Sequence, residues 1–360
     1  MNIFLSVLIL ILIFGAMVTV HEAGHFFAAK WFRMDVREFA IGMGPALYKR
    51  KRREDEHGHP VGAAFSLRVF PVGGFCDLGE DNESDDPRHF RNHPLWQRCA
   101  VLFAGAAMNL LLGLLLAVVL CLSLVGHSVF NTEITGFADG FPYADQIQAG
   151  DVIVKVNGHA VYSYRNLDLF LQRGAGSPYE LTLRRGQERI TVSGIERTVE
   201  VEDGRRIIGL YFEGGDDVTF PYALKMAWFI AVDYVRLVQL SLGDLITGRA
   251  APTEMMGPVG VGGVVSQTLE QSRSAGDALF SLINLAALLS INLAVFNLLP
   301  VPALDGGRIL LAVISFGLIR IRKRPLSARI EGSLHGVMFI LLIGLMVFVF
   351  FNDIRRLSGL

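Results

Sequence analysis

Four long stretches without a charged side chain constrain this sequence more than any other feature. They run over residues 1–20, 101–125, 278–303 and 336–352. A helix needs roughly 20 apolar residues to cross a bilayer, with a lower bound of about 17. The composition agrees, because 52% of the 360 residues are hydrophobic, 19% are charged and the mean hydropathy is +0.43. The sequence therefore predicts a polytopic α-helical membrane protein with about four transmembrane helices.

The first stretch has the length of a secretory signal peptide as well as that of a retained helix. It lacks a basic n-region, and no small-residue cleavage site precedes Lys30. We therefore expect a retained transmembrane helix. The formal net charge of −1 gives no basic footprint for nucleic acid, so we expect no nucleic-acid partner.

Lysine and arginine concentrate in two of the segments that connect these stretches. The basic residues are Lys30, Arg33, Arg37 and the run 49–53 after the first stretch, and Arg308, Arg320, Arg322, Lys323, Arg324 and Arg329 before the fourth. Basic loops face the cytoplasm, so the long segment 127–277 and both termini would face outward. Arg355 and Arg356 oppose this orientation. The run 49–53 would either contact anionic lipid headgroups or form a solvated loop that sets the topology.

The outward segment has the pattern of a small water-soluble domain. Residues 132–200 alternate short β-rich runs, such as 151–158 and 180–185, with turns and one helical stretch at 163–172. Residues 219–242 are amphipathic, as in a helix lying along the membrane surface. We predict an N-terminal membrane half at 1–126, an inserted α+β domain at 127–218, an amphipathic surface segment at 219–277 and a C-terminal membrane half at 278–360.

The first apolar stretch ends in His21-Glu22-Ala23-Gly24-His25. Residues four apart share one face of a helix, so His21 and His25 can direct two imidazoles at one ion. This HExxH spacing supplies two nitrogen ligands for zinc, with Glu22 as the general base. Ionisable groups beside an apolar helix are costly and therefore mark function. The alternative is three interfacial side chains emerging into water.

A catalytic zinc ion usually has three protein ligands, so a third is required. Glu54 and Glu56 are conceivable, but they lie in a basic, solvated run. Asp305 is the better candidate, because it follows the third apolar stretch within 297–307 and lies at the same cytoplasmic depth as His25. Two prolines break the helix there, and the following glycine pair lets the backbone turn sharply.

Further motifs complete a pattern that runs the length of the chain. They are FAIGMGP at 39–45, PVGGF at 71–75, GAAMN at 105–109, AGDVIVKVNG at 149–158, GPVG at 257–260, and Asn292 with 297–307. With the HExxH sequence, they make the chain resemble the site-2 protease class of intramembrane zinc metalloproteases. It is most similar to the bacterial regulator of sigma-E protease group, among the members with a single PDZ domain.

This resemblance implies roles for particular residues. His21, His25 and Asp305 would bind Zn²⁺, with Glu22 as the catalytic base. The substrate-binding residues would be Asn292, Asn297, Gly73 and Gly74. Residues 62–76 would form a membrane-associated β-hairpin that pairs with the substrate by strand addition. An unwound substrate helix needs new partners for its backbone inside the bilayer, and an edge strand offers them.

The resemblance also implies a function. The protein would be a zinc metalloendopeptidase that hydrolyses peptide bonds within or near transmembrane segments of membrane-anchored proteins. Its substrates would be anti-sigma factors or remnant signal peptides after a first cut, as in regulated intramembrane proteolysis. It would span the inner (plasma) membrane, in contact with the lipid bilayer, with the active site towards the cytoplasm.

The inserted domain resembles a PDZ domain but departs from it at one loop. Residues 137–142 lack the usual glycine loop that cradles a carboxylate. Capture of a peptide C-terminus is therefore not implied. The extracytoplasmic PDZ-like domain would contact a peptide or protein in another way, or it would control access to the active site.

Two other classes of function fit parts of the pattern. A membrane scaffold would use the PDZ-like domain to recruit partners, with a structural metal or none, but a structural site has no need of Glu22. A zinc transporter would place ligands within the membrane, but it would need no PDZ-like domain. Cleavage by the wild type that is lost in Glu22→Gln separates a protease from both.

Overall fold

The computed structural model describes residues 3–54, 60–79, 84–174, 178–200, 206–212, 215–251, 255–322 and 328–357. The chain divides into two compact units. One consists of Met1–Ala117 together with Tyr234–Leu360, and the other of Val118–Asp233. We call the first the membrane unit and the second the α+β unit.

Four helices are long and apolar enough to cross a membrane within the described part of the chain. They are α1 (Ile3–Trp31), α2 (Leu95–Leu122), α6 (Ala275–Asn297) and α8 (Ala328–Leu357). The candidate spans are 23 to 28 residues long, enough to exceed the hydrocarbon thickness of about 30 Å at 1.5 Å per residue. The predicted polytopic helical architecture is confirmed.

Two of these helices end at other positions than the uncharged stretches suggest. Helix α1 continues through the HExxH sequence to Trp31, because the residues after His25 are again apolar. The motif therefore lies inside a membrane helix and not at its end. Helix α6 ends at Asn297, before Pro300 and Pro302. The residue before a proline is disfavoured in the α conformation, so the helix cannot continue.

The other helices are shorter or less apolar. They include α4 (Phe220–Thr247), α5 (Pro258–Gln271), α7 (Asp305–Arg322) and the 3₁₀ turn η1 (Phe90–Asn92). The segment predicted to be amphipathic, 219–242, corresponds to most of α4. Helix α5 packs against α1, α6 and α8.

A sheet beside α1 consists mainly of two long bent strands, β1 (Glu38–Arg50) and β4 (Ala64–Asp77); β2 (Arg53–Glu54) and β3 (Pro60–Val61) form a small pair nearby. Residues 38–41 pair in parallel with 64–67 on one side and antiparallel with 74–77 on the other. Residues 46–50 pair with the far side of 64–68. The hairpin predicted at 62–76 is thus part of a larger sheet, in which residues 38–41 of β1 lie between its two arms.

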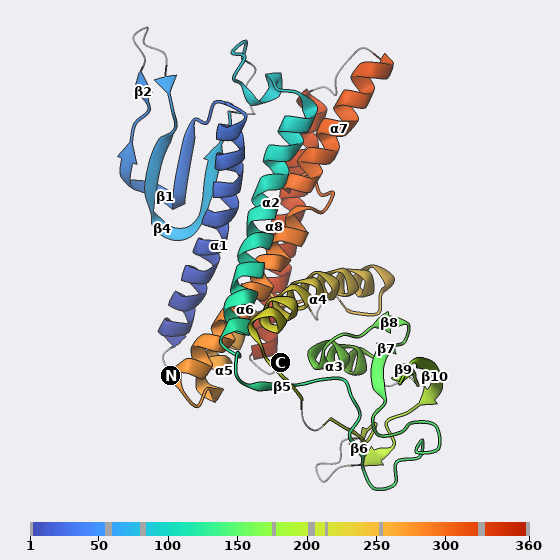
Figure 1. Cartoon of the computed structure of the whole chain (residues 1–360). Helices are drawn as coiled ribbons and strands as arrows, with labels where there is room; N and C mark the ends of the chain where they lie inside the picture. Colours follow the sequence, from blue (N-terminus) through green and yellow to red (C-terminus); the bar gives the residue numbers. More distant parts are fainter. Residues whose placement is uncertain are drawn as a thin grey trace. The chain divides into compact units, whose positions relative to one another are not determined.

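Positive φ angles at glycine allow the sharp bends in these strands. Gly42 and Gly44 in β1 have φ of +85°, and Gly73 in β4 has φ of +81°. An L side chain rarely adopts this conformation. The bent sheet packs along α1 (Figure 1), where Gly15 leaves room for the carbonyl of Pro71. Residues 74–77 remain as the edge strand, with no second strand partner among the described residues.

The α+β unit is built around a four-stranded sheet in the order β10-β9-β7-β8. Its strands are β5 (Ser128–Phe130), β6 (Gly136–Phe137), β7 (Val152–Val156), β8 (His159–Ala160), β9 (Tyr179–Arg185), β10 (Glu188–Ile195), β11 (Val199–Glu200), β12 (Arg206–Ile207), β13 (Leu210–Tyr211) and β14 (Gly215–Asp217). Helix α3 (Tyr164–Arg173) begins after Ser163, whose side chain accepts from the Asn166 N–H. The core includes Ile153, Leu167 and Leu181, each at most 1% exposed.

Candidate metal centre and active site

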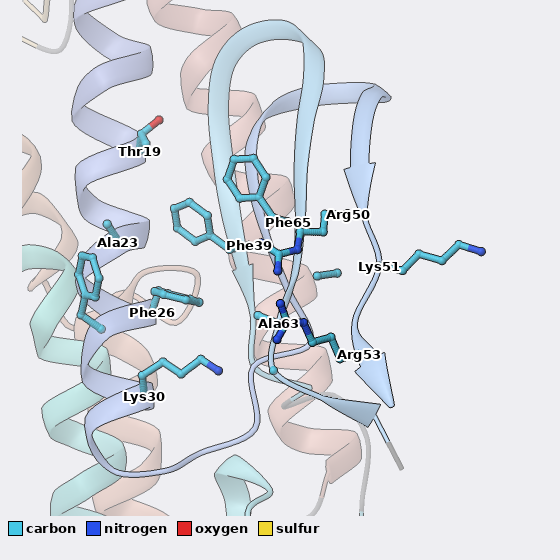
Figure 2. A pocket seen from close by; sticks show the side chains of 13 residues that line it. Thr19, Ala23, Phe26, Lys30, Phe39, Arg50, Lys51, Arg53, Ala63 and Phe65 are labelled. Atoms are coloured by element: carbon cyan, nitrogen blue, oxygen red, sulfur yellow. The ribbon is translucent and has the colours of Figure 1, made fainter. Parts of the chain in front are cut away.

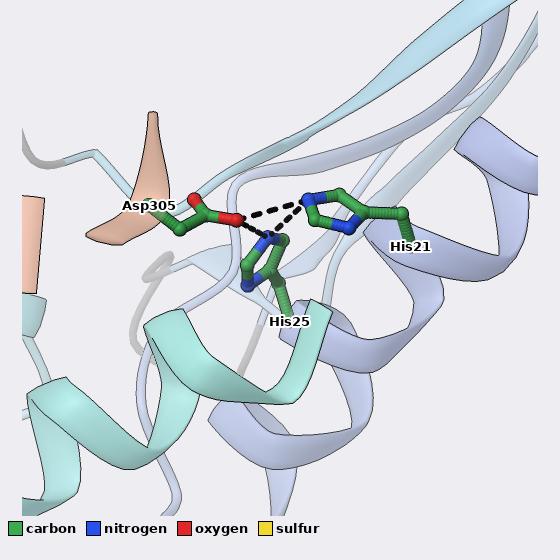
Figure 3. A group of neighbouring side chains, drawn as sticks. All are labelled: His21, His25 and Asp305. Atoms are coloured by element: carbon green, nitrogen blue, oxygen red, sulfur yellow. Dashed lines mark hydrogen bonds and ion pairs between the residues drawn. The ribbon is translucent and has the colours of Figure 1, made fainter. Parts of the chain in front are cut away.

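His21, His25 and Asp305 meet although 284 and 280 positions separate Asp305 from the two histidines (305 − 21 and 305 − 25). Asp305 Oδ2 lies 3.0 Å from His21 Nε2 and 3.3 Å from His25 Nε2. The two Nε2 atoms are 3.1 Å apart (Figure 3). All three residues are buried, between 5% and 7% exposed. Three potential ligand atoms therefore converge on one point within the membrane unit.

This geometry fits a tetrahedral zinc ion. Ligand atoms 2.0–2.1 Å from such an ion stand about 3.3 Å apart, close to the three observed separations. Asp305 Oδ2 is buried, and no hydrogen bond of acceptable geometry satisfies it among the described residues. Two imidazoles and one carboxylate are also a donor set typical of catalytic zinc. These residues can hold the metal that the sequence motif predicts.

Asp305 is the first residue of α7, and the two glycines after it allow close packing. A Cβ at Gly306 would clash with the carbonyl of Leu298, and one at Gly307 with the carbonyl of Val301. Both glycines have ordinary helical φ, so the expected sharp turn at the glycine pair is absent. The small residues instead hold the start of α7 against the preceding loop, which directs Asp305 to the histidines.

The Asp305 carboxylate is suited to a cation. Its buried Oδ2 faces the Nε2 atoms of both His21 and His25. Its second oxygen, Oδ1, faces Arg308 Nη1 at 3.7 Å. The carboxylate therefore presents one charged oxygen to the centre while the other is directed toward a cation on the same helix.

The orientation of His25 is set by a backbone carbonyl of α2. His25 Nδ1 lies 2.8 Å from the carbonyl oxygen of Val101. A carbonyl only accepts, so Nδ1 must carry the proton that it donates. The lone pair is then on Nε2, which faces Asp305. This is the usual outer-shell arrangement for a metal-binding histidine.

Two asparagine side chains approach the other ring nitrogen of His21. The amides of Asn109 on α2 and Asn297 on α6 each lie 3.4 Å from His21 Nδ1. The amide oxygen of Asn109 is buried without a hydrogen-bond partner among the described residues. Amide oxygen and nitrogen are assigned from the hydrogen-bond network. Rotating the Asn109 amide lets its oxygen accept from Nδ1–H, which again leaves Nε2 free for a metal.

Glycines bring α1 and α2 close enough for these contacts. A Cβ at Gly24 would clash with the carbonyl of Ala104, and a Cβ at Gly105 would lie 2.8 Å from Cε1 of His21 and closer still to the ring of His25. Small residues at helix crossings permit close backbone approach within membranes. Val101, Gly105 and Asn109 recur every four residues, so one face of α2 forms the wall behind both imidazoles.

Glu22 lies between the metal-binding cluster and the edge strand. Its Oε2 accepts a hydrogen bond of 2.9 Å from the backbone N–H of Cys76. The Glu22 side chain also approaches Gly74, where a Cβ would be 3.8 Å from Glu22 Cγ. A carboxylate in this position can reach both a water beside the cluster and a peptide paired with residues 74–77.

The remaining predicted residues fall into two groups. Asn297 contacts His21, whereas the side chain of Asn292 makes no hydrogen bond to the described residues. Five helical residues rotate the side chain by about 140° beyond a full turn, so the two face different directions on α6. Gly73 has the positive φ described above, and Gly74 leaves room for the carbonyl of Ala40 across the strand pair.

Among the described residues, no alternative third ligand lies at the cluster. Glu56 and the neighbouring pair His57 and His59 lie outside the described residues. Among the described residues, the cluster of potential metal ligands consists of His21, His25 and Asp305 alone.

Sequence reasoning missed the outer-shell contacts. The Val101 carbonyl and the Cys76 N–H are backbone groups, which every residue carries, so no sequence signal marks them. Asn109 did carry a signal, because a polar amide stands within an otherwise uncharged apolar stretch. Polar groups in that position usually have a partner within the bundle.

Comparisons with known proteins give a consistent result. The profile of Peptidase family M50 matches residues 9–345. A protein of Clostridium perfringens, named among the zinc metalloproteases, is 33% identical over 96% of this chain and 97% of its own length. Zinc metalloprotease RasP of Geobacillus kaustophilus is 27% identical over 98% of each chain. Metalloprotease MmpA of Caulobacter vibrioides is 26% identical over 96% and 94%.

One solved structure is similar to a smaller part of the chain. It is the PDZ domain of an SdrC-like protein from Listeria monocytogenes, 21% identical. The similarity covers 24% of this chain and 90% of that domain, with a TM-score of 0.21.

Proposed function

Because this chain belongs to Peptidase family M50, the site-2 protease family of zinc metalloproteases, we propose that it cleaves membrane-anchored proteins within or near their transmembrane segments. Its substrates are the remnants left after a first cut, such as truncated anti-sigma factors or remnant signal peptides. This is the second step of regulated intramembrane proteolysis.

The proposal assigns the zinc ligands to His21, His25 and Asp305, supported by the converging ligand atoms described above. Bound zinc supplies a Lewis acid that favours deprotonation of the attacking water. Glu22 takes the proton of that water while the new C–O bond forms. It then delivers the proton to the amine as the C–N bond breaks.

The observation that carries the proposed substrate class is the contact between Glu22 and the edge strand. Cys76 offers its N–H to the Glu22 carboxylate, and among the described strands residues 74–77 pair with residues 38–41 on one side alone. A substrate strand added to that edge would pass directly beside the base. A transmembrane helix that unwinds loses its internal hydrogen bonds, and strand addition replaces them.

Other residues have supporting roles in this proposal. Asn297, which lies beside His21, would hold the substrate carbonyl, and Asn292, which faces another direction on α6, would contact the substrate further from the metal. Gly73 and Gly74 would keep the edge free of side chains, so that a substrate strand can approach. The active site would lie towards the cytoplasmic side of the inner membrane, as the basic loops predict. The PDZ-like domain, residues 127–218, would be extracytoplasmic and would contact or exclude substrates.

Substrate class can be tested with full-length protein in proteoliposomes. Three substrates are compared: one transmembrane protein with its outer domain intact, the same protein truncated close to the membrane, and a soluble unfolded protein. We expect cleavage of the truncated form, slower or no cleavage of the intact form, and none of the soluble protein. Equal cleavage of all three would contradict an intramembrane substrate.

The two alternative classes are less consistent with the chain. Family membership identifies a metalloprotease, and neither a scaffold nor a zinc transporter requires a carboxylate hydrogen-bonded to an edge strand. Uptake of zinc into proteoliposomes without any proteolysis would favour the transporter.

A further inference from the structure

A second site lies on the side of α1 opposite the metal-binding cluster. A cavity of about 740 Å³ opens between α1 and the sheet. Its α1 wall consists of Thr19, Ala23, Phe26, Phe27 and Lys30. At about 100° per residue, this face points away from the face that carries His21 and His25. The cavity is therefore distinct from the active site.

The deeper wall of this cavity is aromatic. Phe26 on α1 and Phe39 on β1 have ring centroids 5.2 Å apart, and Phe39 stacks on Phe65 of β4 at 6.3 Å. Figure 2 shows these rings between the helix and the strands. Phe27 adds a further ring that is 62% exposed. Such a wall stabilises an apolar ligand and leaves unfavourable apolar surface if it contacts water.

The rim of the cavity is cationic. Arg50 and Arg53 direct their guanidinium groups from the sheet side toward α1, and Lys30 extends from α1 toward the strands (Figure 2). Lys30 also lies 5.8 Å from the Phe26 ring centroid. Like charges that converge repel one another, and an anion bound between them removes that repulsion.

The basic residues at the cavity differ from their neighbours in whether a carboxylate pairs with them. Lys49 pairs with Glu38 at 2.8 Å, and Arg52 pairs with Asp35. For Lys30, Arg50 and Arg53, the described residues provide no carboxylate within ion-pair distance. Within the run 49–53, Lys49 and Arg52 are thus neutralised by carboxylates of the membrane unit, whereas Arg50 and Arg53 line the cavity and can bind a ligand.

The cavity lies at the depth of a lipid headgroup. Lys30 and Trp31 end the first candidate span, and Trp31 is 84% exposed. Tryptophan and basic residues concentrate at the membrane–water interface. From this end the α1 wall continues toward Thr19, which lies further into the span. The cationic rim is therefore at the interface and the aromatic wall extends toward the bilayer core.

We propose that this cavity binds one anionic glycerophospholipid, with its phosphate between Lys30, Arg50 and Arg53 and an acyl chain along Phe26, Phe39 and Phe65. The charge complementarity requires an anion, and the aromatic wall requires an apolar chain on the same ligand. A bound lipid contacts both α1 and the sheet, so it stabilises their association independently of catalysis.

Lipid binding can be measured on delipidated full-length protein by native mass spectrometry. Phosphatidylglycerol is compared with phosphatidylcholine of identical chains, so that the net charge of the headgroup is the variable. We expect phosphatidylglycerol to bind about tenfold more tightly, since each basic contact to an anionic lipid contributes substantially. The triple variant Lys30→Gln/Arg50→Gln/Arg53→Gln should bind both lipids equally.

Two further variants are controls, one for misfolding and one for a general loss of positive charge. Lys30→Arg/Arg50→Lys/Arg53→Lys keeps the charges and should keep the preference. Arg184→Gln/Arg189→Gln/Arg320→Gln removes three charges from residues that do not line the cavity and should also keep it. Zinc content of each variant reports whether the membrane unit has folded.

Three results would overturn the proposal. The first is equal binding of both lipids by the wild type. The second is an undiminished phosphatidylglycerol preference in the charge-removal variant. The third is displacement of the lipid by millimolar glycerol phosphate or by an acidic peptide as effectively as by phosphatidylglycerol, which would show a site for a soluble anion or a protein segment.

Discussion

The metal-binding cluster and the α+β unit show two different ways of building a structure from this sequence. In the cluster, buried polar groups from α1, α2, α6 and α7 meet inside an apolar unit, and glycines give them the space to do so. In the α+β unit, neighbouring strands pair through short turns, as at Asn157-Gly158, where both residues have positive φ. The cluster therefore depends on distant backbones, whereas the α+β unit depends on local pattern.

This difference predicts that one methyl group is enough to disrupt the cluster. In Gly105→Ala the added Cβ would overlap the ring of His25. Overpacking of about 3 kcal/mol corresponds to roughly a hundredfold weaker zinc binding. Metal content after dialysis against a buffered zinc solution measures this. Gly317→Ala, where a Cβ meets nothing within 4 Å, is the matched control, and equal loss of zinc in both variants would contradict the packing argument.

The α+β unit should respond to the loss of a local ion pair without any effect on zinc. Asp151 is 1% exposed and accepts two bonds from Arg185, at 2.7 and 2.8 Å. Asp151→Asn should destabilise this unit by about 2 kcal/mol, seen as faster hydrogen exchange in β7 and β9. Asp145→Asn, at an exposed position, should not. A parallel loss of zinc in Asp151→Asn would break the distinction between the two regions.

Removal of one outer-shell amide should weaken the cluster less than an added methyl group. Asn109→Leu removes a partner of His21 Nδ1, while Asn297 still approaches the same nitrogen. We expect about tenfold weaker zinc affinity, the lower end of outer-shell effects. Competition with a zinc chelator measures it. Ser290→Ala removes a bond to the Asn109 carbonyl and should leave the affinity unchanged; equal affinities in all three proteins would show that Asn109 does not orient His21.

The smallest effect is expected in the sheet, where a surface charge network can be titrated. Burial raises the pKa of Glu38, but bonds from Lys49, Ser66 and Arg68 outweigh it and lower the pKa to about 2. Because the folded pKa is lower than the unfolded one, the stabilisation is complete above about pH 4.3. It is lost as the pH falls through the folded value.

Glu38→Gln tests this titration. At pH 7 the variant should be about 1 kcal/mol less stable than the wild type, the usual size of such a bond. Thermal unfolding in detergent should show that this difference shrinks at pH 3. A difference that stays constant with pH would mean that the Glu38 charge is not responsible.

Sequence patterns predicted those features that depend on periodicity. The spacing of His21 and His25 places both on one helical face, and Asp305 does reach them. The helix at 163–172 corresponds to α3, with Ser163 as its cap. Four apolar stretches correspond to four long helices, because a run of about 20 apolar residues is a direct consequence of bilayer thickness.

The bent sheet and the contacts around the cluster could not be predicted in the same way. Residues 38–41 have partners on both sides, one parallel and one antiparallel, and alternation within a strand does not specify which neighbour it has. The Val101 carbonyl becomes special only because Gly24 and Gly105 bring two helices together. These features depend on the packing of elements far apart in the chain.

The most direct test of the account compares the wild type with Glu22→Gln. A truncated transmembrane substrate is incubated with each protein in detergent, and zinc content is measured on the same samples. Loss of a general base lowers the rate by about 10²–10⁴-fold. We predict cleavage by the wild type alone, with nearly one zinc ion in each protein. Retained cleavage in Glu22→Gln would contradict the assignment of Glu22 as the base, and absence of zinc from both proteins would contradict the metal centre itself.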